Sequence, residues 1–323
     1  MPYSAIAVTQ WFLSGRSSFG LSGFERASKS FSPATLQSDL RGQNHIITGG
    51  NAGLGLATAT ALARMNATVH LVCRDKARGE EAVQKITKDT SSDSIHLHIA
   101  DLSSVDSVKK FAASWLDSKR PVDVLINNAG AMLKSREVNS DGNEISMTSA
   151  LNGTYLLTTL LLPALQLAKN PRVINVSSGG GLTVKLDVDD LNCSKRKYDG
   201  TEQYAHAKRA QMHLTELFAR KNPSISFYSM HPGWAATPGV QKALPDFFEG
   251  KWGTLRTSEQ GSDTIVWLAA VKPDCIDKAS NGKFFFDRAP VSQHYFLAGT
   301  SLTKEEEERM WVNVQDICKH RWA

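Results

Sequence analysis

A short apolar segment, a glycine-rich loop and an alanine-rich segment follow one another directly near residue 50. Residues 44–48 predict a buried strand, and residues 54–65 predict a helix. Glycines in the loop allow a tight turn and a close approach of the backbone to another group, and a helix N-terminus stabilises negative charge. The three segments together predict a site for the phosphates of a nucleotide, formed by Thr48, Gly49, Asn51, Gly53, Leu54 and Gly55.

Strand-like and helix-like segments alternate along the rest of the chain. Apolar strands are predicted at residues 68–72, 95–99, 123–126, 172–176, 225–230 and 282–286. Helices between strands favour a doubly wound parallel sheet of about seven strands, covered by helices on both faces, with ligands at the carboxyl ends of the strands. We predict one such α/β domain at residues 41–300, preceded by an arm (1–40) and followed by a helical tail (301–323).

Composition excludes several classes of partner. The net charge is +5, but lysine and arginine are spread along the 323 residues, which argues against a nucleic-acid-binding surface. The four cysteines are far apart and form no Cys-x-x-Cys motif, so no metal site is predicted and a reducing compartment is favoured. The sequence contains no run of 18 apolar residues, so no membrane span is predicted.

Residues 1–40 contain nine serines and several aromatic residues. They lack the compact apolar core and small-residue cleavage site of a secretory signal, so we expect an intracellular protein, cytoplasmic or peripheral on an intracellular membrane. Two interpretations stay open for this arm: it packs on the domain, or it forms a helix at a membrane surface.

Tyr204 and Lys208 form a candidate acid/base pair. They lie four residues apart in a segment whose alanines and leucines predict a helix, so they share one helix face. A nearby ammonium favours the phenolate and is expected to lower the pKa of the tyrosine toward neutral pH. Because Tyr-x-x-x-Lys is frequent by chance, the pair gains weight only from the motifs around it.

Several motifs resemble the short-chain dehydrogenase/reductase family over nearly the whole chain after residue 40. They are the spacing Gly-x-x-x-Gly-x-Gly from Gly49, Asn127-Asn128-Ala129-Gly130, Tyr-x-x-x-Lys, and Pro232-Gly233 with Thr237. The polar segment 187–197 resembles the retinol-dehydrogenase-like branch. The resemblance implies a Rossmann-type fold and a nicotinamide cofactor. It also implies oxidation or reduction of a carbonyl/alcohol pair on a small apolar substrate, such as a retinoid, a steroid or an aldehyde.

The resemblance also assigns roles to individual residues. It places Asp101 and Leu102 at the adenine, Asn128, Ala129 and Gly130 beneath the nicotinamide ribose, and Pro232, Gly233 and Thr237 at the carboxamide. Arg74 is expected to meet a 2′-phosphate with its guanidinium, which favours NADP(H) over NAD(H). Ser103 or Ser104 competes for the Asp101 segment as a helix cap.

The resemblance further implies three catalytic residues. Ser178, with Ser177 as the alternative, would bind the substrate oxygen, Tyr204 would transfer the proton, and Lys208 would bind the nicotinamide ribose. Phe247, Phe248 and Trp252 belong either to a mobile lid at residues 234–256 or to the core.

One position departs from the family pattern. Ala150 stands where most members carry a helix asparagine that holds a water near the catalytic lysine. Asn152 lies about 200° round the helix and could replace it only if the helix were shifted or bulged. Three outcomes stay open: backbone groups hold the water, proton resupply is slow, or the chain is a catalytically inactive NADP(H)-binding regulatory protein. Isomerase or lyase chemistry with bound cofactor, and a homodimer, are also left open.

Overall fold

The computed structural model describes residues 4–249 and 253–322. Its centre is one sheet, in which the described strands follow the order β3-β2-β1-β4-β5-β6-β7-β8. All neighbours are parallel except β7 and β8. The strand bounds are Asn44–Thr48 (β1), Thr68–Cys73 (β2), Ile95–Ile99 (β3), Val124–Asn127 (β4), Arg172–Val176 (β5), Ser226–His231 (β6), Phe284–Phe286 (β7) and Ala289–Val291 (β8). The predicted doubly wound α/β fold is confirmed, with an antiparallel edge strand added.

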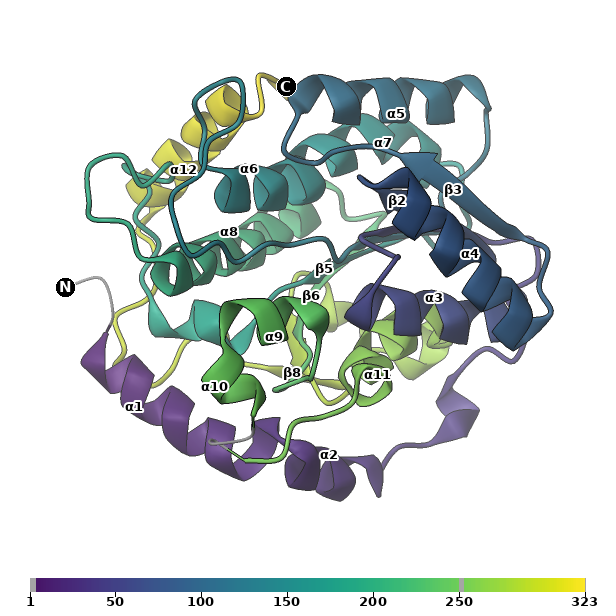
Figure 1. The fold of residues 1–323 in the computed structure, drawn as a ribbon, viewed down its shortest axis with the longest axis horizontal. Coiled ribbons are helices and arrows are strands. Elements are labelled where there is room, and N and C mark those ends of the chain that lie inside the picture. Colours follow the sequence, from purple (N-terminus) through teal and green to yellow (C-terminus); the bar gives the residue numbers. More distant parts are fainter. Residues whose placement is uncertain (1–3, 250–252, 323) are drawn as a thin grey trace.

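Helices cover both faces of the sheet (Figure 1). One apolar cluster lies between the sheet and α3 (Gly53–Arg64), α4 (Lys76–Thr90) and α11 (Ser258–Ala270). A second cluster lies on the other face, under α5 (Val105–Asp117), α8 (Gly200–Lys221) and α12 (Lys304–Ile317). Burial on both faces explains why the central strands read as apolar runs rather than as alternating patterns.

The helix predicted at residues 145–168 is interrupted. It consists of α6 (Ile145–Leu151), a π-helical segment η3 (Asn152–Leu157) and α7 (Thr158–Leu165). Thr158 Oγ1 donates to the carbonyl of Gly153, five residues earlier, which fits the wider turn. The helix is therefore bulged at the position where the sequence left this outcome open.

The arm packs on the domain through α1 (Ala5–Ser14), a π-helical turn η1 (Gly15–Phe19), α2 (Leu21–Ser28) and a 3₁₀ turn η2 (Pro33–Thr35). It runs beneath α9 (Pro238–Ala243), α10 (Pro245–Phe248) and α11 in the view of Figure 1. Its backbone is bonded at several points: Ser4 N donates to Thr183 O at 3.1 Å, and Leu21 N donates to Thr254 O at 2.9 Å. The described part of the arm is therefore bonded to the domain.

Two short helices, α9 (Pro238–Ala243) and α10 (Pro245–Phe248), occupy the predicted lid. Phe247 packs edge-on against Trp234 at a centroid distance of 5.2 Å. Trp252 and the side chain of Phe248 lie outside the described residues. In the described part of the chain, no helix has both the length and the apolar character needed to cross a bilayer.

Three 3₁₀ turns complete the described elements. They are η4 (Gly179–Thr183), which follows β5, and η5 (Pro273–Cys275) and η6 (Lys278–Ser280), which lie between α11 and β7.

Candidate active site

The glycine loop after β1 adopts the conformation that its composition predicts. Gly49 and Gly53 have φ values of +66° and +51°, which L side chains rarely adopt. Gly55 is needed for close approach, because a Cβ there would lie 2.3 Å from the carbonyl oxygen of Gly49. The loop and the first turn of α3 are therefore held close against β1.

The loop after β4 is bonded to the glycine loop. The backbone N–H groups of Asn128 and Ala129 both donate to Thr48 Oγ1 at 3.0 Å, and Asn128 Nδ2 donates to Thr48 O at 2.9 Å. Gly130 borders the ammonium of Lys208, since a Cβ on this glycine would lie 3.1 Å from Nζ. The two loops that are predicted to contact one ligand are thus hydrogen-bonded to each other.

The N-terminus of α3 fits a phosphate group. Its N-cap residue is Ala52, and no side chain in the described part of the chain caps this end. Backbone N–H groups of the first turn are therefore available, and the helix dipole favours an anion there. Asn51, Gly53 and Leu54 are half-buried beside them. These residues would hold the pyrophosphate of a dinucleotide.

Arg74 and Asp75 follow β2 and lie in different surroundings. Asp75 caps α4 by accepting a hydrogen bond from Arg78 N at 3.1 Å, so its carboxylate is engaged in the helix. Arg74 is exposed at the end of the strand. The exposed guanidinium is therefore available to a ligand here, whereas one oxygen of the Asp75 carboxylate is used by the helix cap.

The residues after β3 provide the helix cap that was weighed for them, and the adenine contact stays a prediction. Ser104 is the N-cap of α5, whereas Asp101 accepts bonds from the backbone and hydroxyl of Ser103 at 2.8 Å each. Leu102 is buried in the core. Capping thus falls to Ser104 and leaves Asp101 half-buried at the strand end.

The turn after β6 lies close to the glycine loop. A Cβ on Gly53 would lie 3.3 Å from Thr237 Cβ, although the Thr237 hydroxyl also caps α9 through Val240 N. Gly233 has a φ of +75° and borders the Arg256 guanidinium. Thr237 therefore lies against the glycine loop, and contact of Pro232, Gly233 and Thr237 with the nicotinamide stays a prediction.

Ser178, Tyr204 and Lys208 come together where β5 ends beside α8. The Ser178 hydroxyl lies beside the phenol of Tyr204, and Lys208 Nζ lies 5.4 Å from the centroid of the Tyr204 ring. Ser177 is buried and donates to the Lys208 carbonyl at 2.8 Å, so it faces away from the phenol. The structure selects Ser178 from the serine pair.

The charge states of the pair differ from those expected. Burial raises the pKa of Tyr204 to about 12, and only the neighbouring Ser178 hydroxyl opposes this rise. Burial also lowers the pKa of Lys208 to about 7. The expected lowering of the tyrosine pKa by Lys208 is not met, because desolvation outweighs the attraction of a partly neutral amine.

Asn152 does not replace the missing helix asparagine. Its amide donates to Leu102 O at 2.7 Å, while Ala150 is packed in the apolar core. Lys208 Nζ instead donates to Val176 O at 2.7 Å and to Gln211 Oε1 at 2.9 Å. The sequence reasoning missed Gln211, although its place three residues after Lys208 on one helix face was a usable signal.

A buried polar chain joins α8 to the sheet. Asn127 Nδ2 donates to Asn175 Oδ1 at 2.9 Å, Asn175 Nδ2 donates to Thr215 Oγ1 at 2.9 Å, and Thr215 Oγ1 donates to Gln211 O. Asn127 and Asn175 are register partners on β4 and β5. An asparagine inside an apolar strand was the signal for this chain, which fixes the height of α8 against the strand ends.

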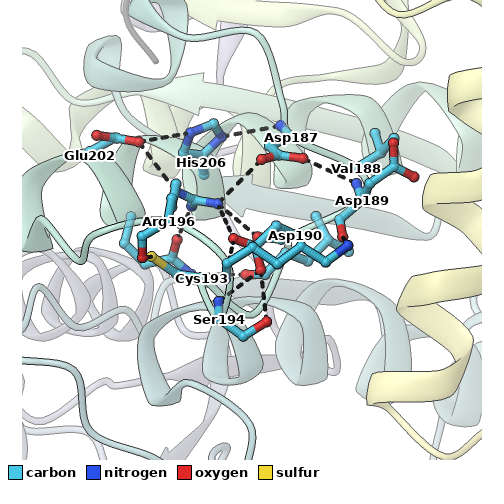
Figure 2. Close-up of polar contacts among 12 residues, drawn as sticks. Asp187, Val188, Asp189, Asp190, Cys193, Ser194, Arg196, Glu202 and His206 are labelled. Atoms are coloured by element: carbon cyan, nitrogen blue, oxygen red, sulfur yellow. Dashed lines mark hydrogen bonds and ion pairs between the residues drawn. The ribbon is translucent and has the colours of Figure 1, made fainter. Parts of the chain in front are cut away.

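A second polar network holds the segment before α8 (Figure 2). The Arg196 guanidinium forms ion pairs with Asp187, Asp190 and Glu202 at 3.5, 3.2 and 3.2 Å. His206 lies beside Glu202 and is neutral, because burial lowers its pKa to about 3. The network fixes the first turns of α8, and so the position of Tyr204.

Sequence comparison assigns the family. The sequence profile of the short chain dehydrogenases matches residues 43–246. The chain belongs to the short-chain dehydrogenase/reductase family. Membership supports an oxidoreductase of carbonyl/alcohol pairs. Human dehydrogenase/reductase SDR family member 12 is 44% identical over 309 residues, covering 96% of each chain, and human retinol dehydrogenase 13 is 34% identical, covering 87% of this chain and 83% of its own.

Solved structures of other proteins share the fold. An uncharacterised protein from Mycobacterium paratuberculosis aligns with a TM-score of 0.70 at 24% identity, covering 91% of this chain and 99% of its own. A short-chain dehydrogenase from Shigella flexneri, crystallised with NADP, aligns with a TM-score of 0.61 at 21% identity, covering 78% of this chain and 100% of its own. The predicted resemblance to this family, and to its retinol-dehydrogenase-like branch, is confirmed.

Proposed function

We propose that this short-chain dehydrogenase/reductase uses NADPH to reduce the carbonyl group of a small apolar molecule to an alcohol. The observation that carries the proposal is the placement of the Ser178 hydroxyl beside the Tyr204 phenol, with the Lys208 ammonium beside the same ring. A hydroxyl and a phenol at one point form a binding site for a single oxygen atom. Developing negative charge on that oxygen is stabilised by both donors.

The pKa of Tyr204 supports the direction of the reaction. A phenol with a pKa of about 12 is protonated at neutral pH, so it is ready to give its proton to an oxygen that becomes negative. The bound nicotinamide supplies the hydride to the carbonyl carbon. Lys208 binds the nicotinamide ribose and, in its charged form, favours proton release by Tyr204. Alcohol oxidation would need the phenolate, which burial disfavours.

The surroundings of Arg74 support NADPH over NADH. Arg74 is exposed at the carboxyl end of β2, while the neighbouring Asp75 is engaged as a helix cap. Lys76 and Arg78 add further positive charge at this strand end. A guanidinium fork suits a 2′-phosphate, whereas ribose hydroxyls are best met by a free carboxylate. The NADP complex of the Shigella flexneri relative agrees with this preference.

The aromatic residues near the turn after β6 support an apolar substrate. Trp234 is buried and packs on Trp11, Phe19 and Phe247. The identity to retinol dehydrogenase 13 favours a retinoid among apolar substrates, with steroid ketones and aldehydes as further members of the class.

The outer face of the arm supports contact with a membrane surface. Ile6 and Leu13 are 49% and 63% exposed on one face of α1, and Gln10 between them donates to Phe296 O at 2.8 Å. Phe296 and Leu297 are 78% and 72% exposed beside it. The double variant Leu13→Glu/Phe296→Glu should sediment less with phosphatidylserine-containing vesicles. Unchanged binding by this variant would remove the membrane proposal.

A carbonyl panel tests the reaction. NADPH oxidation should be measured with retinal, steroid ketones and simple aldehydes, with the alcohol product quantified. We expect one class to give stoichiometric loss of NADPH and gain of alcohol. NADPH that stays intact while the substrate changes would indicate isomerase or lyase chemistry instead.

Ala150 motivates the competing function, an NADP(H)-binding regulatory protein without useful catalysis. Measurable reduction by the unaltered protein excludes it. A chain that reduces no carbonyl but gains turnover in the Ala150→Asn variant would support it.

A further inference from the structure

The Lys208 ammonium is held by two acceptors within a buried site. Its side chain is 3% exposed, and Nζ donates to the Val176 carbonyl at 2.7 Å and to Gln211 Oε1 at 2.9 Å. Gly130 borders the same nitrogen without a side chain. An ammonium has three N–H donors, so two fix its position and one remains for the side of the predicted ribose.

The orientation of Gln211 follows from its partners. Lysine can only donate, so the amide must turn its oxygen toward Lys208 and its nitrogen toward Thr154 Oγ1, at 2.8 Å. Thr154 lies in the π-helical segment η3, next to Gly153. Gln211 is 1% exposed and its amide bridges the two helices. The wide turn of η3 thus serves to anchor the amide that holds the lysine.

We infer that Gln211 is a positioning residue, which holds the Lys208 ammonium in place through an amide anchored on Thr154. The inference rests on the proposed function for its effect on turnover. Ala150 brings no polar atom to this region, and Asn152 is bonded to Leu102, so Gln211 is the side-chain amide that this chain provides to the lysine.

The groups around the ammonium make its charge sensitive to Gln211. β5 contributes the Val176 carbonyl, the loop after β4 contributes Gly130, η3 contributes Thr154, and α8 contributes Tyr204, all uncharged at neutral pH. Burial alone lowers the pKa of Lys208, and an amide oxygen that accepts from the ammonium opposes this fall. Loss of the oxygen should lower that pKa further, and a carboxylate in its place should raise it.

Two substitutions of Gln211 test the inference in opposite directions. NADPH affinity and kcat/KM should be measured against pH for the full chain, Gln211→Met and Gln211→Glu. Lys208 is charged below its pKa, so both quantities should fall as pH rises through that value. We expect the midpoint to move down by about one pH unit in Gln211→Met and up by about one unit in Gln211→Glu. At a fixed pH between the two midpoints, the NADPH affinity and the kcat/KM of the two variants should then differ by about tenfold.

Matched variants separate positioning from folding. Gln315→Met makes the same change at a buried glutamine of α12 and should leave the midpoint in place. If Gln211→Met does not fold, Thr154→Val replaces it, because loss of the anchoring hydroxyl should move the midpoint downward by a smaller amount. A merely structural role of Gln211 would reduce NADPH binding or turnover in both variants. The midpoints of the two variants would then not move in opposite directions.

The possible outcomes distinguish this inference from the proposed function. NADPH binding with opposite midpoint shifts, but with no turnover of any carbonyl, would support the role of Gln211 and refute the reductase. Turnover with unmoved midpoints in both Gln211 variants would refute the role of Gln211 and leave the reductase standing. A chain that binds no NADPH would overturn both.

Discussion

The proposed cofactor side and the proposed substrate side of the site are built in different ways. The cofactor side consists of the loops after β1 and β4. Hydrogen bonds between Thr48 and Asn128 hold the two loops together, and Gly55 allows the backbone of α3 to approach the first loop. The substrate side joins residues from distant parts of the chain: Phe19 of the arm packs on His231 and Trp234. Motifs therefore describe the first side well and the second side poorly.

Arg256 forms hydrogen bonds to several segments of the substrate side. Arg256 is 1% exposed and pairs with Asp287 at 2.6 and 2.9 Å. It also donates to Ser18 O at 2.9 Å and to Gly20 O at 3.4 Å, which ties the arm to the turn at Gly233. A single side chain thus joins four segments that are separate in the sequence.

Acid should destabilise the whole domain, and so both sides together, with the largest total effect. Burial lowers the pKa of four histidines to about 3: His45 in β1, His70 in β2, His206 in α8 and His231 in β6. In the unfolded chain these groups bind protons near pH 6.5, so stability is full above pH 6.5 and falls as pH decreases toward 3. Each histidine should contribute about 1.4 kcal/mol per pH unit. Urea unfolding at several pH values measures the slope, and a flat profile between pH 6.5 and 5 would contradict the account.

Arg256→Met should act on the contacts that join the arm to the turn at Gly233. Removing one partner of a buried ion pair leaves Asp287 uncompensated, so we expect a loss of about 3–5 kcal/mol in the free energy of unfolding. Urea unfolding and limited proteolysis of the arm measure it. Arg309→Met, in an exposed pair with Asp189, is the control and should cost less than about 1 kcal/mol. Equal losses in the two variants would show that Arg256 does not hold the arm.

Gly55→Val should affect the cofactor side alone. A side chain at this position would meet the Gly49 carbonyl, so the glycine loop must move away from α3. We expect NADPH affinity to fall by about 100-fold, roughly 2.7 kcal/mol, in fluorescence titrations. Gly239→Ala, where the nearest atom to a new Cβ is 3.8 Å away, is the control. Normal NADPH binding by Gly55→Val would mean that the loop does not contact the cofactor.

Arg74→Ala should sharpen the comparison within the cofactor side. Loss of one guanidinium–phosphate contact should weaken NADPH binding by about tenfold, roughly 1.4 kcal/mol, and leave NADH binding unchanged. The exposed Arg41→Ala variant serves as the control for a general change in net charge. Equal weakening of NADPH and NADH would refute a 2′-phosphate contact at Arg74.

The sequence was sufficient where the deciding interactions are local. Alternating strands and helices predicted the doubly wound sheet, and glycine spacing predicted the loop after β1, because both depend on neighbouring residues. The choice between Ser177 and Ser178 depends on how β5 ends, which one sequence does not show. The π-helical turn at Asn152–Leu157 and the bond from Lys208 to Gln211 arise from packing between helices.

The pKa of Tyr204 shows the same limit in energetic terms. The spacing to Lys208 predicted a lowered value, but the depth of burial decides the sign and cannot be taken from spacing. Arg256 was missed for a related reason, since its partners lie about 30 residues away at Asp287 and more than 200 residues away at Ser18.

Tyr204→Phe tests the central claim most directly, with NADPH affinity and NADPH-dependent carbonyl reduction measured on the same preparation. The substitution removes only the phenolic oxygen, so the cofactor side should stay intact while the proton donor is lost. We predict an NADPH affinity within about threefold of the unaltered protein and a fall in kcat of about 10²- to 10⁴-fold. Wild-type turnover by Tyr204→Phe would show that the proton comes from another group and would contradict the account.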